Sequence, residues 1–125
     1  PDKEAVAALL GLGPGLTPSG DDFLGGMLIA LHVCGENSVQ KQLYTEVESL
    51  LDRTGPVSSA HLKAAALGEG SHSLHQVINM LLKGNDAKLK LAIHTINQIG
   101  HTSGWDALAG AAVVLRQLAS NYRSA

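Results

Sequence analysis

Two segments of this chain, 84 residues apart, share the pattern Ser-Gly-x-Asp-x-Leu-x-Gly. One begins at Ser19 and the other at Ser103, and an apolar stretch follows each, as far as Leu31 and Leu115. Apolar residues lie almost all round each stretch when it is drawn as a helix, and such a helix is buried rather than amphipathic. The repeat therefore predicts two quasi-equivalent helices at the centre of the fold.

Each repeat also predicts how its helix begins and where it packs. An aspartate follows the serine three residues later in both, which is the spacing of a capping box, so we expect Ser19 and Ser103 to be N-cap residues. One turn beyond the aspartate, on the same face, each helix has a glycine, Gly26 or Gly110. Because glycine lets another backbone approach closely, we expect the two helices to cross near this pair.

The remainder of the chain predicts more helices and no alternating strand. Its 125 residues suit one domain, and with 45% hydrophobic but only 3% aromatic residues the core must be aliphatic. Glycines, prolines and capping residues separate periodic apolar segments. Helices are expected over 2–10, 21–31, 39–51, 60–67, 72–83, 86–99 and 104–122. The predicted fold is all-α, a compact single-domain bundle of six or seven helices over residues 1–125, with two central apolar helices that follow Gly/Ser-rich loops.

Charge and cysteine content exclude several classes of protein. The formal net charge is −2, whereas nucleic-acid-binding and membrane-surface modules need a basic face. The longest apolar run, 23–33, is too short to span a bilayer. A single cysteine, Cys34, excludes an internal disulfide and suits the reducing cytoplasm, where we expect it to be an inert thiol. Because the chain begins at Pro1 rather than at a methionine, we expect it to be a fragment or a processed piece of a longer protein.

The loops before the two central helices are the candidate site. A helix N-terminus carries free N–H groups and a partial positive charge, so two of them brought together would bind an anion without a cofactor or a metal. His101 is placed for proton transfer. The three nearby aspartates are expected to order the loops or to meet an amide or amine end of the substrate. The expected binding residues are Thr17, Ser19, Gly20, Asp21, Asp22, Thr102, Ser103, Gly104 and Asp106.

Other interpretations of these residues stay open. Capping boxes also occur on helices that bind nothing, and the three aspartates could instead hold a divalent cation as in a metal-dependent hydrolase. Trp105 is expected either to form a wall of the pocket or to lie in the core. Ser58 or Ser59 is expected to cap a helix, and His61 beside them to be a solvated histidine.

The two motifs are similar to those of a known family. The segments GLGPGLTPSGDDFLGG (residues 11–26) and GHTSGWD (residues 100–106) resemble the C-terminal part of a bacterial family long described as a domain of unknown function. That family includes the AllH-type subunit of oxamate carbamoyltransferase, from anaerobic allantoin degradation, a branch of purine catabolism.

The resemblance implies a cytoplasmic subunit of a multi-subunit enzyme that converts oxalurate and phosphate into oxamate and carbamoyl phosphate. All four are anions. The implied partners are a small anionic substrate and the other subunits. A non-catalytic assembly or regulatory subunit, whose loops contact partner subunits, is the alternative.

Overall fold

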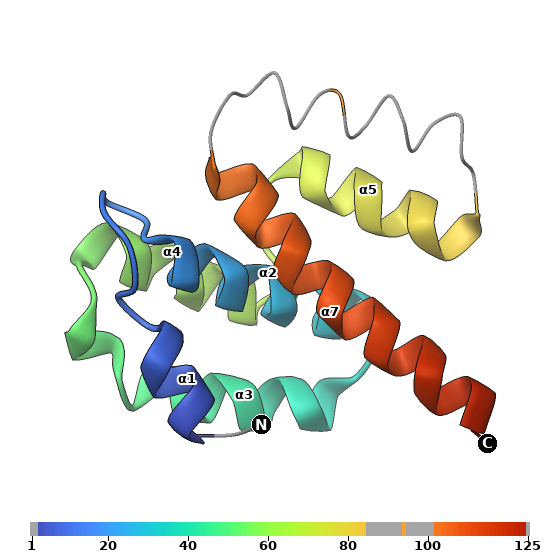
Figure 1. Cartoon of the computed structure of the whole chain (residues 1–125), viewed down its shortest axis with the longest axis horizontal. Coiled ribbons are helices and arrows are strands. Elements are labelled where there is room, and N and C mark those ends of the chain that lie inside the picture. The colour runs from blue at the N-terminus through green and yellow to red at the C-terminus, as the bar shows by residue number, and fades with distance from the viewer. Residues whose placement is uncertain (1–2, 85–93, 95–101, 125) are drawn as a thin grey trace.

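The computed structural model describes residues 3–84, 94 and 102–124, and of residues 102, 103 and 122–124 the backbone only. Every element in these parts is a helix (Figure 1), which confirms the predicted all-α bundle. The helix expected over 86–99, apart from residue 94, and His101 lie outside the described residues. The elements are α1 (Lys3–Leu9), α2 (Ser19–Val33), α3 (Asn37–Glu48), a 3-10 turn (Leu51–Arg53), α4 (Pro56–Ala66), α5 (His72–Lys83) and α7 (Thr102–Ser124).

The centre of the fold is the crossing of α2 and α7. The contact between α2 and α7 is the most extensive between any two described helices, and α2 also packs against α1, α3 and α4. Figure 1 shows the two helices crossing obliquely with their N-terminal ends on the same side. A Cβ atom built on Gly26 would lie 1.9 Å from the Ala107 carbonyl oxygen, and one on Gly110 would lie 2.0 Å from that of Phe23. The predicted crossing at these two glycines is confirmed.

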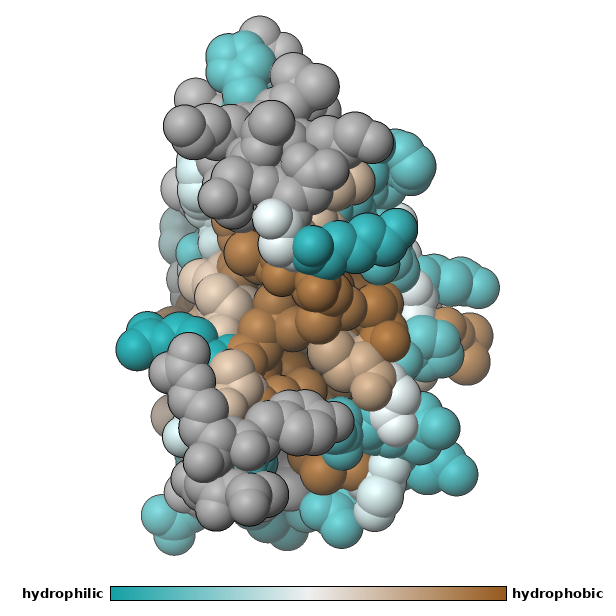
Figure 2. All heavy atoms as spheres, turned by 90° about the vertical axis from the view of Figure 1, so that its right-hand side faces the viewer, coloured by the Kyte–Doolittle hydropathy of each residue, from teal (hydrophilic) through white to brown (hydrophobic). Residues whose placement is uncertain are grey.

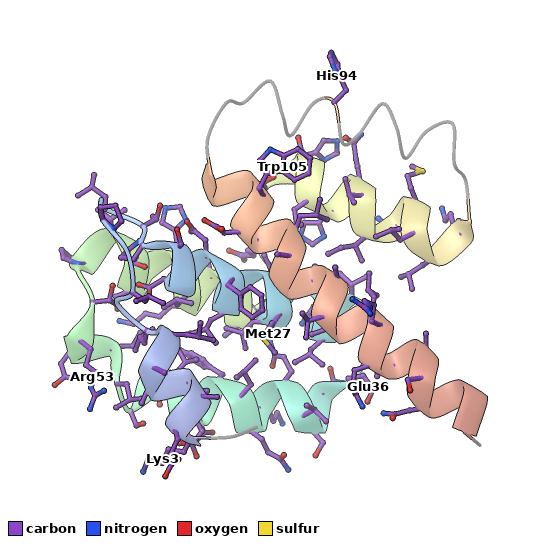
Figure 3. The ribbon with its side chains drawn as sticks, in the orientation of Figure 1. Lys3, Met27, Glu36, Arg53, His94 and Trp105 are labelled. Carbon is purple, nitrogen blue, oxygen red and sulfur yellow. The ribbon has the colours of Figure 1, made fainter. Side chains whose placement is uncertain are left out.

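The core around this crossing is aliphatic, as the composition predicted. Helix α2 is buried along most of its length, whereas α7 is less enclosed, since Val113 in its middle is 47% exposed. Trp105, labelled at the start of α7 in Figure 3, does not lie in the core, because it is 42% exposed. The largest fully buried apolar side chains are Leu24, Leu28, Val47, Leu62, Val77 and Ile78.

The helix starts differ from the predicted capping boxes. The N-cap of α2 is Pro18, which makes no side-chain cap, and its carbonyl accepts the N–H groups of Asp21 and Asp22. Ser19 is therefore the first residue of the helix rather than its cap. Ser103 likewise lies inside α7, which begins at Thr102. The prediction of two serine N-caps is therefore wrong.

Proline also moves the start of α4. Pro56 occupies the first helical position, where its fixed φ suits a helix, and Gly55 is the N-cap. Ser58 is consequently inside the helix rather than its cap. The helix expected over 72–83 is confirmed as α5: Ser71 is its N-cap and accepts the N–H of Leu74 at 3.1 Å, and Gly84 ends the helix with φ +69°.

An apolar surface lies on the side of the molecule drawn in Figure 2. A groove of about 240 Å³ runs between α2, α3 and α7, and Val39 and Val113 on its edges are each more than 40% exposed. None of the described helices is long and apolar enough to cross a membrane.

Candidate functional site

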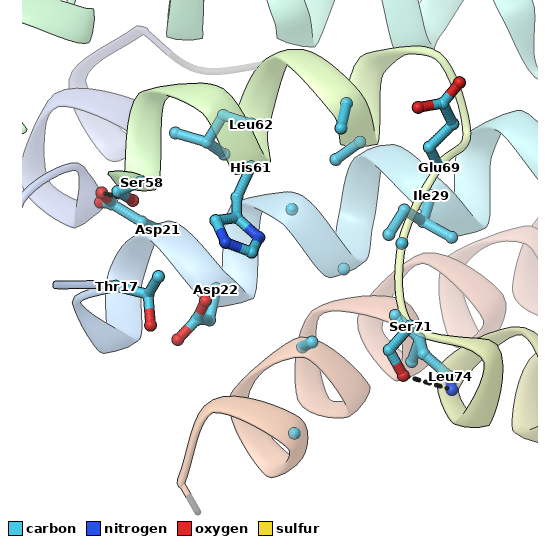
Figure 4. Close-up of a pocket in the computed structure, with 17 residues that line it drawn as sticks. Thr17, Asp21, Asp22, Ile29, Ser58, His61, Leu62, Glu69, Ser71 and Leu74 are labelled. Carbon is cyan, nitrogen blue, oxygen red and sulfur yellow. Dashed lines mark hydrogen bonds between the residues drawn. The ribbon is translucent and has the colours of Figure 1, made fainter. Parts of the chain in front are cut away.

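A cavity of about 520 Å³ lies among α2, α4, the start of α5 and the start of α7 (Figure 4). Its floor is apolar and built from small and aliphatic residues of α2, α4, α5 and α7. Polar side chains gather at two ends: Thr17, Asp22 and His61 at one, Glu69 and Ser71 at the other. The described lining residues are Thr17, Asp21, Asp22, Gly25, Gly26, Ile29, Ser58, His61, Leu62, Ala64, Ala65, Glu69, Gly70, Ser71, Leu74, Gly104 and Ala107.

The starts of α2 and α7 border this same cavity. Thr17, Asp21 and Asp22 line it from the α2 side, and Gly104 lines it from the first turn of α7. The close approach at Gly26 and Gly110 causes this convergence, because it brings two helices together near their N-terminal ends. Four of the residues expected at the site thus lie around one hollow.

Ser19 and Gly20 lie outside the lining. The Gly20 N–H donates to the Leu12 carbonyl at 3.0 Å, and a Cβ on Gly20 would lie 1.9 Å from the Leu9 carbonyl oxygen. Position 20 therefore requires glycine because the end of α1 lies against it, and Gly20 does not line the cavity. Ser19 faces the same loop, beside Gly13.

Asp21 is a buried connection between three segments of the chain. Its side chain is 2% exposed, and Oδ1 accepts the N–H of Gly11 at 2.7 Å. Oδ2 accepts the hydroxyl groups of Thr54 and Ser58. One carboxylate therefore joins the glycine-rich loop, the segment after the 3-10 turn and α4 to the first turn of α2.

The equivalent aspartates, Asp22 and Asp106, differ in their relation to the cavity. The Oδ2 atoms of both are buried, but only Asp22 lines the cavity. Asp106 Oδ2 has no hydrogen-bond partner among the described residues. Thr102 and Ser103 belong to the first turn of α7 by their backbone, and their side chains lie outside the description, as does His101. Trp105 does not line the cavity.

Sequence reasoning missed the contribution of α4. Helix α4 begins at Pro56, and one of its faces borders the cavity. The residues on this face, at helical spacing, are Ser58, His61, Leu62 and Ala65. The His61 imidazole projects from α4 toward the end of the cavity where Thr17 and Asp22 lie (Figure 4). The position of Pro56, two residues before Ser58, is the feature of the sequence that could have predicted where α4 begins.

The charges around the cavity are unequal. Among the lining residues that the structure describes, Asp21, Asp22 and Glu69 carry carboxylates, and His61 alone can become positively charged. In the described part of the chain, no three acidic, histidine or cysteine side chains lie close enough together to hold a metal ion. Of the three aspartates expected at the site, Asp21 accepts hydrogen bonds from within the chain, and Asp106 does not line the cavity.

Comparison with known families identifies the chain through the segment that contains both repeats. A family model described as oxamate carbamoyltransferase subunit AllH matches residues 9–115, which include both glycines of the crossing and all the described residues that line the cavity. No solved structure matches the chain. By this match over most of its length, the chain belongs to the AllH family of oxamate carbamoyltransferase subunits.

Proposed function

We propose that this chain takes part, in the cytoplasm, in the transfer of a carbamoyl group between oxalurate and phosphate, and that the cavity binds one of the small anions of that reaction. The observation that carries the proposal is the convergence of the α2 and α7 starts on one hollow. Concave sites with an apolar floor and a few convergent polar groups are where small ligands bind. The family match supplies the chemical class of the ligand.

The two helix starts contribute unequally in this proposal. In the first turn of α2 the N–H groups of Gly20, Asp21 and Asp22 already donate to the carbonyls of Leu12 and Pro18. Donors for an anion would therefore come chiefly from the first turn of α7, which presents Gly104 and includes Thr102 and Ser103, and from the Thr17 hydroxyl. His101 precedes this turn and remains the proposed group for proton transfer.

The acidic side of the cavity suits the other end of the substrate. Oxamate and oxalurate both carry amide N–H groups beside a carboxylate, and Asp22 is proposed to accept such an N–H. Carbamoyl transfer to or from phosphate depends mainly on positioning the reactants and on stabilising developing negative charge. A cavity that holds both the N–H and the anionic end of one reactant would perform the first of these tasks.

Substitution of Thr17 in the full-length protein, assembled with the other subunits, tests the proposal. Thr17→Val removes the hydroxyl and keeps the shape, so KM for oxalurate or for phosphate should rise about tenfold. Thr45→Val is the matched control, since Thr45 is exposed on α3 and its hydroxyl donates to the Lys41 carbonyl in its own helix. Unchanged kinetic constants in Thr17→Val, with both variants folded and assembled, would contradict the proposal.

A second candidate function, assembly of the enzyme without catalysis, is favoured by the loop between α1 and α2. Leu12 is 57% exposed and Leu16 is 76% exposed on this loop. Large apolar side chains held at the surface by an ordered loop are suited to contact with another subunit. Leu16→Ser should then abolish co-purification with partner subunits and leave the fold of the chain unchanged, whereas Thr17→Val should leave assembly intact.

A further inference from the structure

We propose that His61 is the residue that binds the anionic group of the ligand, which makes the ligand a small carboxylate held by a protonated imidazole. This inference rests on the proposed function of the cavity, and it assigns the anion to a different element, α4, from the helix starts considered so far. It also predicts how binding depends on pH.

The fold holds His61 in a fixed place at the cavity. One turn earlier on the same face, the Ser58 hydroxyl donates to the buried Asp21 carboxylate, which attaches α4 to α2. The next residue, Leu62, is 1% exposed, and Ala65 one turn later is 3% exposed. With anchors before and after it, the backbone at His61 is rigid, while its own side chain is exposed and projects into the hollow (Figure 4).

The proposed role of His61 follows from the charges of the side chains around the cavity. The titratable groups that border the cavity with it are Asp21 and Asp22 from α2 and Glu69 from the connection between α4 and α5, and all three are acidic. The lining residues from α5 and α7, which are Ser71, Leu74, Gly104 and Ala107, carry no ionisable side chain. A carboxylate that enters this cavity is repelled by these acids. Among the described lining residues, only His61 can offset that repulsion with a positively charged side chain.

Binding of a carboxylate should therefore weaken as the pH rises. Histidine ordinarily changes its charge between about pH 5 and pH 8, whereas the oxamate carboxylate stays ionised throughout this range. Oxamate is thus a better probe than phosphate, which itself titrates near neutral pH. Any change in oxamate affinity over this interval reports a group on the protein.

The experiment is calorimetric titration of oxamate into the full-length protein with its partner subunits, at several values between about pH 5.5 and pH 8.5. The dissociation constant should rise about tenfold over this range. His61→Gln should bind about tenfold more weakly at the acidic end and show no pH dependence. His61→Arg, which keeps a positive charge, should bind at all values. His72→Gln is the matched control, because His72 is exposed on α5 and does not line the cavity.

The outcomes separate the two proposals. A wild-type affinity that is independent of pH, or a His61→Gln profile that matches the wild type, overturns the assignment of His61 and leaves anion binding at the cavity standing. An absence of oxamate binding by the wild-type protein at every pH also overturns the assignment of His61, and the proposed function fails with it if oxalurate and phosphate do not bind either. Because His61 is exposed, its variants should unfold at the wild-type temperature, so a loss of affinity cannot be attributed to misfolding.

Discussion

Gly26 of α2 and Gly110 of α7 occupy equivalent places on the two sides of one helix crossing. Gly26 lies against the carbonyl of Ala107, and Gly110 lies against the carbonyl of Phe23. These two partners are themselves 84 residues apart, as the glycines are. The repeat in the sequence is therefore also a repeat in the contact. It fixes how closely two helices approach, and that approach sets the starts of both helices beside the same cavity.

Replacement of either glycine by alanine should destabilise the fold. The added methyl group would overlap a backbone carbonyl in each case, since the distances would be 1.9 Å and 2.0 Å. Alanine gains about 1 kcal/mol of helix propensity over glycine, but the helices would have to separate. We expect the free energy of unfolding in urea to fall by about 2 kcal/mol for Gly26→Ala and for Gly110→Ala.

Gly25→Ala is the matched control for this crossing. The nearest atom to a Cβ at position 25 is the Ala65 Cβ at 3.9 Å, an ordinary contact. This variant should be as stable as the wild type or slightly more stable. Equal effects of alanine at positions 25, 26 and 110 would show that helix propensity rather than close packing governs the crossing.

Removal of the Asp21 carboxylate should also destabilise the fold, independently of any ligand. Asp21→Ala leaves the Gly11 N–H and the hydroxyl groups of Thr54 and Ser58 without their acceptor. Hydrogen bonds to a charged group contribute about 1.5–3 kcal/mol each, with partial compensation by water. We expect a loss of about 3 kcal/mol in urea unfolding, against almost none for Asp52→Ala, an exposed aspartate. If Asp21→Ala were as stable as the wild type, the structural role of Asp21 would be refuted, and its position beside the cavity would have to explain its presence.

Cys34 at the end of α2 should react slowly with thiol reagents. Burial, and to a lesser degree the negative charge of Glu36, raise the pKa of its thiol above the ordinary value. A higher pKa leaves less of the reactive thiolate at any pH below it. Iodoacetamide should therefore modify Cys34 more slowly than free cysteine at about pH 8, and the difference should shrink as the pH rises further. Glu36→Gln should speed the reaction only modestly, because burial is the larger cause. A faster reaction than that of free cysteine would refute the prediction of an inert thiol.

The crossing could be predicted from the sequence because its cause is local. A glycine one turn beyond each repeated aspartate is visible in the residues themselves, and the helix pattern then fixes which face it occupies. The starts of the helices could not be predicted in the same way. Pro18 and Pro56 each shift a start by their fixed backbone geometry, and this moved the serines from cap positions into the first turn.

The role of Asp21 and the place of His61 depend on contacts that are distant in sequence. Asp21 bonds residues 33 and 37 positions away, and no local pattern names such partners. His61 faces the cavity only because α4 packs on α2 in the register that this carboxylate sets. The close approach of Gly20 to the Leu9 carbonyl is likewise not visible in any local pattern.

The most direct test of a ligand at the two helix starts is a crystal structure of the full-length protein with its partner subunits, grown with saturating oxamate and phosphate. We expect density for oxamate in the cavity between Thr17, His61 and Gly104, with its carboxylate toward the imidazole and its amide toward Asp22. Density for oxamate at another place on the protein, or an empty cavity at concentrations that support turnover, would contradict this assignment of the site.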